Sequence, residues 1–385
     1  MSIAIFGAAG EIGSRLTLHL LEKGVDVKIF TRASISPVLG RYCLKPIAIP
    51  TNEISQLSKE LRGCSVVINC AIDKKNFSTT RDLIKRNVEL VRNILKASEQ
   101  ADVNKVIHLS SIVVLPPKIT PTVINNPYEY SKENDWYTMT KIATEKIIHN
   151  YHGKLKCIIL RPAIVYGPGL SWSIVAFSRI KRSSIILPAN NGYCYAIHVD
   201  DLCQLIHYLT ENKTNQLIYG INPELVTWFD FYSFHASSIG LKAHLQQQSV
   251  PTIESLVRIP PTPSLIKRNI QWLIQNPFLS LLPKITILKI IGKRVTQWST
   301  PHINDKINDV EMIPYYPPLY PSPLELEMYQ SNGVFSDDQI GCGFSFGYHK
   351  NLNDGTKHAG CWWNFKLQEL MPNELTMLNA HFKRK

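Results

Sequence analysis

A tyrosine and a lysine stand four residues apart in the stretch Tyr137-Thr-Met-Thr-Lys141. On a helix this spacing puts both side chains on one face, so a phenol and an ammonium group can meet the same ligand. A phenol with a pKa of about 10 is a weak base at neutral pH, and a neighbouring cation is expected to lower that pKa. The pair is therefore a candidate acid–base centre, although the same spacing also arises by chance on helix surfaces.

A hydroxyl group precedes this pair, at the end of an apolar run. Ser111 follows Val106–Leu109, which has the composition of a buried strand. Ligands bind at the carboxyl ends of strands in parallel sheets, so Ser111 can hold a carbonyl or alcohol oxygen against Tyr137. Ser111, Tyr137 and Lys141 together form a candidate site for proton exchange at that oxygen.

Three glycines stand between a strand-like run and a helical pattern near the start of the sequence. Gly7 permits a tight turn, Gly10 lets the backbone approach a pyrophosphate, and Gly13 lets helix and strand pack closely. The free N–H groups of the helix N-terminus suit the phosphates. A tight turn without a ligand is the alternative. The pattern predicts a dinucleotide site formed by Gly7, Ala9, Gly10, Glu11, Ile12 and Gly13.

The choice of cofactor depends on the end of the second strand-like run, Val27–Phe30. An acidic residue there would bind the ribose 2′-hydroxyl of NAD, whereas an arginine accommodates the 2′-phosphate of NADP. The sequence places Arg32 at this point, and Asp26 lies too early, at the beginning of the run. NADP is therefore favoured over NAD, although stacking of Arg32 on the adenine would leave the choice open.

The elements that must position these side chains follow a regular order over the first two hundred residues. Short runs rich in Ile and Val alternate with longer helical patterns. This alternation predicts an α/β fold with right-handed crossovers, a Rossmann-type doubly wound parallel sheet. We expect strands at Ser2–Phe6, Val27–Phe30, Val66–Cys70, Val106–Leu109 and Cys157–Leu160, and helices at Glu11–Lys23, Asp82–Ala97 and Trp136–Tyr151.

The regularity fades from about residue 226 onward. Proline-rich stretches interrupt the remaining sequence while apolar residues stay plentiful, which predicts a smaller, irregular C-terminal substrate lobe. We therefore predict an NAD(P)-binding domain over residues 1–225, with an excursion toward the substrate near 167–192. Residues 226–385 are expected to form mainly the substrate-binding lobe.

The spacing GxxGxxG, together with Ser111, Tyr137 and Lys141, resembles the extended short-chain dehydrogenase/reductase family, also called the NAD(P)-dependent epimerase/dehydratase family. Three further stretches extend the likeness, which is tight to about residue 210 and thin afterwards: Val67–Ala71, Leu160–Gly169 and His198–Asp201. The resemblance implies that Ser111 orients the substrate oxygen, that Tyr137 exchanges its proton, and that Lys141 binds the nicotinamide ribose. It also implies cofactor contacts from Ala71, Pro162 and Val165.

The sequence departs from the family pattern just after the serine. Sugar-nucleotide 4,6-dehydratases carry an acid and a base there, whereas this chain has Ile112 and Val113, so 4,6-dehydratase chemistry is disfavoured.

Three functions remain open. They are an epimerase or reductase of a nucleotide-activated sugar, a 3β-hydroxysteroid dehydrogenase-like enzyme of a hydrophobic hydroxy or keto compound, and a non-enzymatic cofactor-binding protein. The first is favoured because the basic charge suits a diphosphate.

Charge and cysteine content limit the classes of partner that are expected. Lysine and arginine number 42 against 30 acidic residues, a formal net charge of +12, which favours anionic ligands or reflects a generally basic surface. No nucleic-acid module or finger-type cysteine spacing accompanies the charge, so neither nucleic acid nor a metal is expected. The eight cysteines are scattered and no secretory signal precedes the glycine loop, which predicts reduced thiols and a cytoplasmic protein.

Two surfaces are candidates for larger partners. The segment Ile270–Gly292 is apolar, but two prolines and two lysines interrupt it, which disfavours a spanning helix. A helix packed on the substrate lobe is favoured there, and peripheral membrane contact through residues 270–295 is the alternative. The apolar helix Trp136–Tyr151 is a candidate contact for a homodimer, because relatives in the resembled family often pair through this element.

Overall fold

We describe a computed structural model of the chain. Its described residues are 2–32, 39, 42, 44–48, 52–74, 79–133, 135–182, 184–212, 216–256, 321–340 and 351–369. The proline-rich stretch at 259–263, most of the one at 314–323 and the apolar segment 270–295 lie outside this part. The predicted membrane contact therefore has no structural account. Among the helices of the described ranges, none is both long and apolar enough to cross a bilayer.

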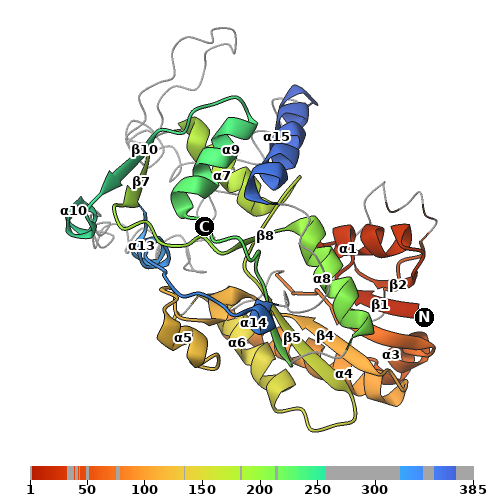
Figure 1. The fold of residues 1–385 in the computed structure, drawn as a ribbon. Coiled ribbons are helices and arrows are strands. Elements are labelled where there is room, and N and C mark those ends of the chain that lie inside the picture. Colours follow the sequence, from red (N-terminus) through yellow and green to blue (C-terminus); the bar gives the residue numbers. More distant parts are fainter. Residues whose placement is uncertain are drawn as a thin grey trace, which may run out of the picture.

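The central sheet confirms the predicted fold class. Within the described residues, six parallel strands are arranged in the order β2-β1-β3-β4-β5-β9 (Figure 1). β1 lies inside the sheet and the chain winds outward from it in both directions, which is the doubly wound arrangement. The strands are β1 Ser2–Phe6, β2 Asp26–Phe30, β3 Cys64–Asn69, β4 Lys105–Leu109, β5 Lys156–Pro162 and β9 Leu217–Gly220.

The predicted strands agree with the structure to within two residues at each end. β3 begins earlier than predicted and ends at Asn69 rather than at Cys70. Two edge pairings were missed. β9 extends the sheet beside β5, and Ile47 forms a parallel bridge to Phe30 beyond β2. Both are short, so a single-sequence pattern offers little signal for them.

Side chains of the central strands alternate between two apolar layers, because successive residues of a strand point to opposite faces. Ile3 and Ile5 of β1 pack with α1 and α8, whereas Ala4 and Phe6 pack with α3, α4 and α6. Helices therefore cover both faces of the sheet (Figure 1). Their bounds are α1 Glu11–Glu22, α3 Ile54–Leu61, α4 Thr80–Gln100, α6 Trp136–His149 and α8 Val199–Glu211.

A second group of elements lies beyond the sheet, where α7, α9 and α15 pack together (Figure 1). A separate apolar cluster joins residues from both sides of position 225, including Ile164, Trp228 and Tyr329. The predicted division of the chain at residue 225 stays a prediction. The remaining elements are η1 Ile112–Val114, α5 Pro121–Asn125, β6 Ile164–Tyr166, α7 Ser171–Arg182, β7 Ile185–Pro188, β8 Ala196–His198, α9 Trp228–Ser238, β10 Leu245–Gln248, α10 Val250–Leu256, α13 Pro323–Met328, α14 Asp337–Ile340 and α15 Leu352–Glu369.

Candidate active site

Ser111 lies two residues beyond β4, at the carboxyl edge of the sheet. Its backbone is extended, and its side chain accepts a hydrogen bond from the N–H of Val113 at 3.4 Å, so it caps the short helix η1. The residue is buried. A local turn thus fixes the direction of the Ser111 hydroxyl, as an orienting group requires.

Tyr137 and Lys141 lie on α6, which packs beside this strand end. Asp135 caps the helix, and its carboxylate accepts hydrogen bonds from the N–H groups of Tyr137 and Thr138 at 2.9 and 3.0 Å. Tyr137 therefore sits in the first turn and Lys141 one turn later, on the same face. The Lys141 ammonium is 5.6 Å from the centroid of the Tyr137 ring. The structure brings together all three residues that the sequence predicted as catalytic.

The ionisation of the pair departs from the expectation. Burial raises the pKa of Tyr137, and a hydrogen bond to Ser111 offsets this only in part. The expected lowering of this pKa is not observed, because desolvation dominates and the nearby carboxylates of Asp135 and Glu11 also raise it. Burial also lowers the pKa of Lys141 to about 8, against which Cys70 and Glu145 act in the opposite direction. Tyr137 is thus a protonated phenol at neutral pH.

A series of buried, hydrogen-bonded side chains connects β3 and β4 to α6, and the sequence analysis did not predict it. The amide nitrogen Nδ2 of Asn69 lies 3.1 Å from Nδ1 of His108, whose Nε2 lies 3.2 Å from the hydroxyl of Thr144. That hydroxyl in turn donates to the carbonyl oxygen of Lys141 at 3.0 Å. Because Thr144 uses its proton there, His108 donates through Nε2 and is neutral. Burial accordingly lowers the pKa of His108 to about 3.

The glycine loop has the shape that a dinucleotide needs. Gly7 has a positive φ of 78°, and a side chain there would meet the backbone of Ala71 at 2.8 Å. A side chain on Gly13 would lie 2.2 Å from the carbonyl oxygen of Gly7. Only glycine fits either position, and the N-terminus of α1 at Gly10 carries no side-chain cap. Its backbone N–H groups therefore suit a pyrophosphate.

The structure locates the other predicted cofactor residues around this loop. Ala71 contacts it directly, through the close approach to Gly7. The Glu11 carboxylate instead accepts a hydrogen bond from the Ser171 hydroxyl at 2.5 Å, which ties α1 to α7. Pro162 ends β5 and Val165 lies buried in β6. Ala9 and Ile12 are half-buried beside the glycines. Their contact with a cofactor stays a prediction.

Arg32 forms an ion pair that the sequence did not reveal. One guanidinium nitrogen lies 3.0 Å from a carboxylate oxygen of Asp73, in the loop that follows β3. The only sequence signal was a lone carboxylate shortly after the Val67–Ala71 stretch. The contact of Arg32 with a 2′-phosphate stays a prediction, and the structure places a carboxylate beside its guanidinium.

A cavity of about 100 Å³ is lined by residues that directly follow Ser111 and Tyr137 in the sequence, although neither Ser111 nor Tyr137 lines it. Its wall begins with the residues that follow Ser111 and continues through Thr138 and through Leu324 and Met328 of α13. Glu133 is the one charged side chain among the described residues that line it, and none of these is basic. The full lining is Ile112, Val113, Leu115, Pro116, Pro117, Ile119, Ser131, Glu133, Thr138, Ile164, Tyr193, Tyr195, Trp228, Leu324, Met328 and Ser331.

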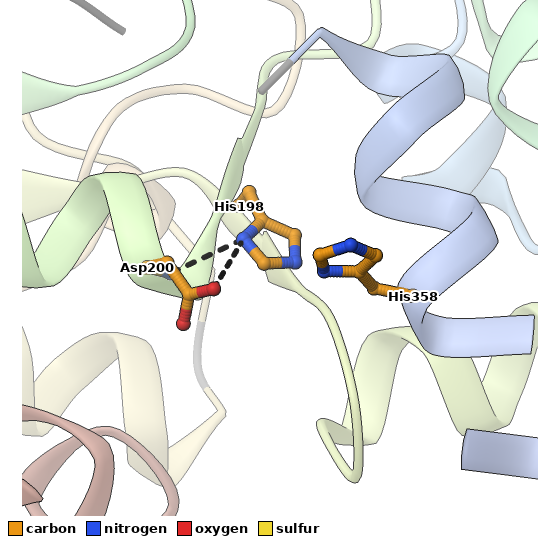
Figure 2. Close-up of side chains that lie close together, drawn as sticks. All are labelled: His198, Asp200 and His358. Atoms are coloured by element: carbon orange, nitrogen blue, oxygen red, sulfur yellow. Dashed lines mark hydrogen bonds and ion pairs between the residues drawn. The ribbon is translucent and has the colours of Figure 1, made fainter. Parts of the chain in front are cut away.

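A second cluster, His198, Asp200 and His358, has ligand-type atoms within 4.8 Å of one another (Figure 2). Nδ1 of His198 accepts a hydrogen bond from the N–H of Asp200 at 3.2 Å, which caps α8. The Asp200 carboxylate also pairs with Arg15 at 3.0 Å. These contacts link α8 to α1, and the ring centroid of His198 lies 6.0 Å from that of His358 in α15. We assign no metal to the cluster.

The glycine loop, the parallel sheet and the Ser111–Tyr137–Lys141 set together define the class of nicotinamide-dependent oxidoreductases and epimerases. Residues 3–221 match the family model described as the NAD dependent epimerase/dehydratase family. The match covers more than half of the chain, and the chain therefore belongs to this family. The resemblance found in the sequence is confirmed, as is the prediction of an enzyme of this class.

Individual relatives are distant. The chain is 22% identical over 265 residues to a sterol-4-alpha-carboxylate 3-dehydrogenase, decarboxylating, of Dictyostelium discoideum, covering 65% of this chain and 80% of the relative. It is 27% identical over 179 residues to a 3-beta-hydroxysteroid dehydrogenase of Mycolicibacterium neoaurum, covering 43% of this chain and about half, 48%, of that relative.

A solved structure of the UDP-glucose 4-epimerase of Thermus thermophilus in complex with NAD superposes with a TM-score of 0.60 at 14% identity. The superposition covers 94% of this chain and 99% of the other. A likeness at this identity shows the fold alone.

Proposed function

We propose that this protein is an NAD(P)-dependent dehydrogenase or reductase of a hydrophobic hydroxy or keto compound. The cavity that begins at Ile112 and Thr138, the residues following Ser111 and Tyr137, carries the proposal, because its described lining is apolar apart from a few hydroxyls and Glu133. A sugar nucleotide brings a diphosphate, which proteins bind with arginine, lysine or helix N-termini. The described lining offers no such cation. The nucleotide-sugar substrate predicted from the sequence therefore takes second place.

The chain's own residues suit the proton transfer at the substrate oxygen and the hydride transfer at the neighbouring carbon. The hydroxyl of Ser111, which caps η1, holds the substrate oxygen, and the Tyr137 phenol exchanges a proton with it. When bound, NAD(P) supplies the hydride acceptor or donor at the neighbouring carbon. Lys141 adds a positive charge one helical turn from Tyr137 and would hold the nicotinamide ribose when the cofactor is bound. The apolar cavity wall excludes water from the reacting carbon.

Tyr137 is a neutral phenol at pH 7 at its usual pKa of about 10, so it can give a proton to a carbonyl oxygen during reduction. Burial raises this pKa further, which makes the group a weaker acid and by itself decides neither direction. We propose reduction with NADPH, with Arg32 near the 2′-phosphate. Localisation in the cytoplasm and a homodimer through α6 remain secondary proposals, and sedimentation of the purified protein tests the latter.

Turnover with matched substrates tests the proposal. Purified full-length protein is mixed with NADPH and either a polycyclic ketone or a UDP-hexose, and the oxidation of NADPH is followed by absorbance. We expect oxidation with the ketone, none with the sugar, and none with either when Tyr137→Phe replaces the wild type.

Two results would overturn the proposal. Interconversion of the UDP-hexose without net NADPH consumption would establish an epimerase instead. Tight NADPH binding without turnover of any ketone in a broad panel would favour the non-enzymatic alternative.

A further inference from the structure

The ion pair between Arg32 and Asp73 spans the carboxyl end of β1. Arg32 follows β2 by two residues and Asp73 follows β3 by four, and β1 lies between these strands in the sheet. The two flanking strand ends are tied to β1 here. The N–H of Gly7 donates to the carbonyl oxygen of Phe30 at 2.9 Å, and the N–H of Cys70 donates to that of Phe6 at 3.0 Å. The pair therefore stands directly beside the glycine loop.

The two partners differ in how firmly they are held. The Arg32 side chain is 68% exposed, whereas the Asp73 side chain is only 8% exposed. Asn87 of α4 fixes the backbone of Asp73 from both sides, because its side chain accepts from the Asp73 N–H at 2.7 Å and donates to the Asp73 carbonyl oxygen at 3.1 Å. Asp73 is thus the fixed partner and Arg32 the movable one.

In such a pair, Arg32 can leave the Asp73 carboxylate for another anion. An ion pair with one partner in water is weak, and a phosphate with two negative charges attracts a guanidinium more strongly than one carboxylate does. The 2′-phosphate of NADP would therefore draw Arg32 away from Asp73. It would do so against two opposing effects, namely the loss of the existing pair and the repulsion between the phosphate and the carboxylate left behind.

We propose that Asp73 is a specificity-determining residue for the cofactor, which restrains the preference for NADP that Arg32 alone would give. This inference rests on the proposed function, because it requires a dinucleotide on the glycine loop. With Asp73 present, the charge at the ribose is nearly balanced, and the 2′-hydroxyl of NAD is tolerated as well as the 2′-phosphate of NADP. Asp73 exerts this effect through its carboxylate and through Arg32.

Binding measurements on variants test the role of Asp73 without any substrate. The dissociation constants of NADP⁺ and NAD⁺ are measured by calorimetry for the wild type, Asp73→Asn, Arg32→Gln and the double variant, at one fixed ionic strength. Asp73→Asn is expected to tighten NADP⁺ by about two- to fivefold, the strength of an exposed pair, and to leave NAD⁺ unchanged. Arg32→Gln should weaken NADP⁺ by about tenfold or more. The double variant should bind NADP⁺ somewhat more tightly than Arg32→Gln, because it also removes the repulsion between the Asp73 carboxylate and the 2′-phosphate.

Asp26 provides the control variant. Asp26→Asn removes the same charge from the opposite end of β2, where the residue is exposed, and should change neither constant. If Asp73→Asn changed both cofactors equally or neither, the role of Asp73 would be refuted while the proposed function stood. If the wild type bound neither dinucleotide, the proposed function would fall as well. Asp73→Ala provides a second variant should the asparagine variant fold poorly.

Discussion

The ammonium group of Lys141 donates a hydrogen bond to the carbonyl oxygen of Leu109, 2.7 Å away. Leu109 is the last residue of β4, and Ser111 follows two residues later. The contact therefore ties the helix that carries Tyr137 to the strand end that carries Ser111. It fixes both the rotation of α6 about its axis and its distance from the sheet, so the Tyr137 and Ser111 hydroxyls meet without a bound ligand to arrange them.

Replacement of Tyr137 by phenylalanine tests the acid–base assignment. Because the variant removes the transferable proton and leaves the ring packing intact, we expect kcat to fall by about 10²–10⁴-fold. NADPH affinity and thermal stability should stay within about twofold and about 0.5 kcal/mol of the wild type. Tyr128→Phe, at a partly exposed position, is the matched control. Unchanged turnover in Tyr137→Phe would refute the assigned chemistry.

Replacement of Lys141 by methionine should separate stability from activity. The folded-state pKa of about 8 lies below the usual value for lysine, so the folded protein binds fewer protons than the unfolded chain between about pH 8 and 10.5. Wild-type stability should rise across that window, and the full cost of the buried charge is present below pH 8. Lys141→Met removes this cost but loses the bond to Leu109, and we expect a net gain of about 1 kcal/mol at pH 7 with loss of activity.

Urea unfolding at pH 7 and pH 10 measures the difference. The wild type should gain stability relative to Lys141→Met on going to pH 10. A variant that is less stable than the wild type at pH 7 would show instead that the hydrogen bond to Leu109 outweighs the desolvation of the ammonium.

The fully buried pair of Arg161 and Glu145 should matter more for stability than any surface pair. The Arg161 guanidinium donates to both carboxylate oxygens of Glu145, at 2.9 and 2.7 Å, and also to the carbonyl oxygen of Pro127 and the hydroxyl of Tyr219. Arg161→Met leaves a carboxylate buried without its partner, so we expect the free energy of unfolding to fall by about 3–5 kcal/mol. Chemical denaturation followed by circular dichroism measures it.

Arg15 supplies the matched control, because its pair with Asp200 is partly exposed, at 36% and 32% of the two side chains. Arg15→Met should cost no more than about 1 kcal/mol. Equal losses in the two variants would contradict the distinction between buried and exposed pairs in this protein.

The neutral His108 predicts a specific loss of stability in acid. Its folded pKa of about 3 lies below the value of 6.5 for a free histidine, so the unfolded chain takes up a proton between these limits and the folded protein does not. This contribution is complete above about pH 6.5 and is lost as the pH falls toward 3, at about 1 kcal/mol per pH unit. His235, whose pKa burial lowers to about 4, acts in the same direction.

A glutamine at position 108 isolates this effect, since its amide can accept from Asn69 and donate to Thr144 without titrating. The unfolding free energy of His108→Gln should depend less steeply on pH between 6.5 and 4 than that of the wild type, by about one proton. His152→Gln, at an exposed position, should keep the wild-type slope. Parallel pH profiles for wild type and His108→Gln would refute the assignment of a neutral buried imidazole.

Local patterns predicted most of the sheet and the acid–base set. Gly7, Gly13, Tyr137 and Lys141 lie within short windows whose spacing reflects a turn or a helical face, and such windows are legible without tertiary structure. The same alternation predicted five of the six parallel strands and the class of the sheet, but not the edge strand β9.

Contacts between distant parts of the chain could not be predicted in this way. Asp73 meets Arg32 across a neighbouring strand, and His108 contacts Thr144, which lies 36 positions later in the chain. The cavity wall formed by Leu324 and Met328 depends on where the chain returns after residue 320. The pKa of Tyr137 was misjudged for the same reason, because desolvation is set by everything packed around the group and not by its sequence neighbours.

The described cavity wall shares no residue with the set proposed to hold the dinucleotide. Substitutions that reshape one surface thus leave the other chemically untouched. A laboratory selection for new substrates could vary the segment after Ser111 and the α13 face freely while the reductant chemistry is kept constant. The same separation would let proteins descended from one ancestor diverge in their substrates long before they diverge in their cofactor.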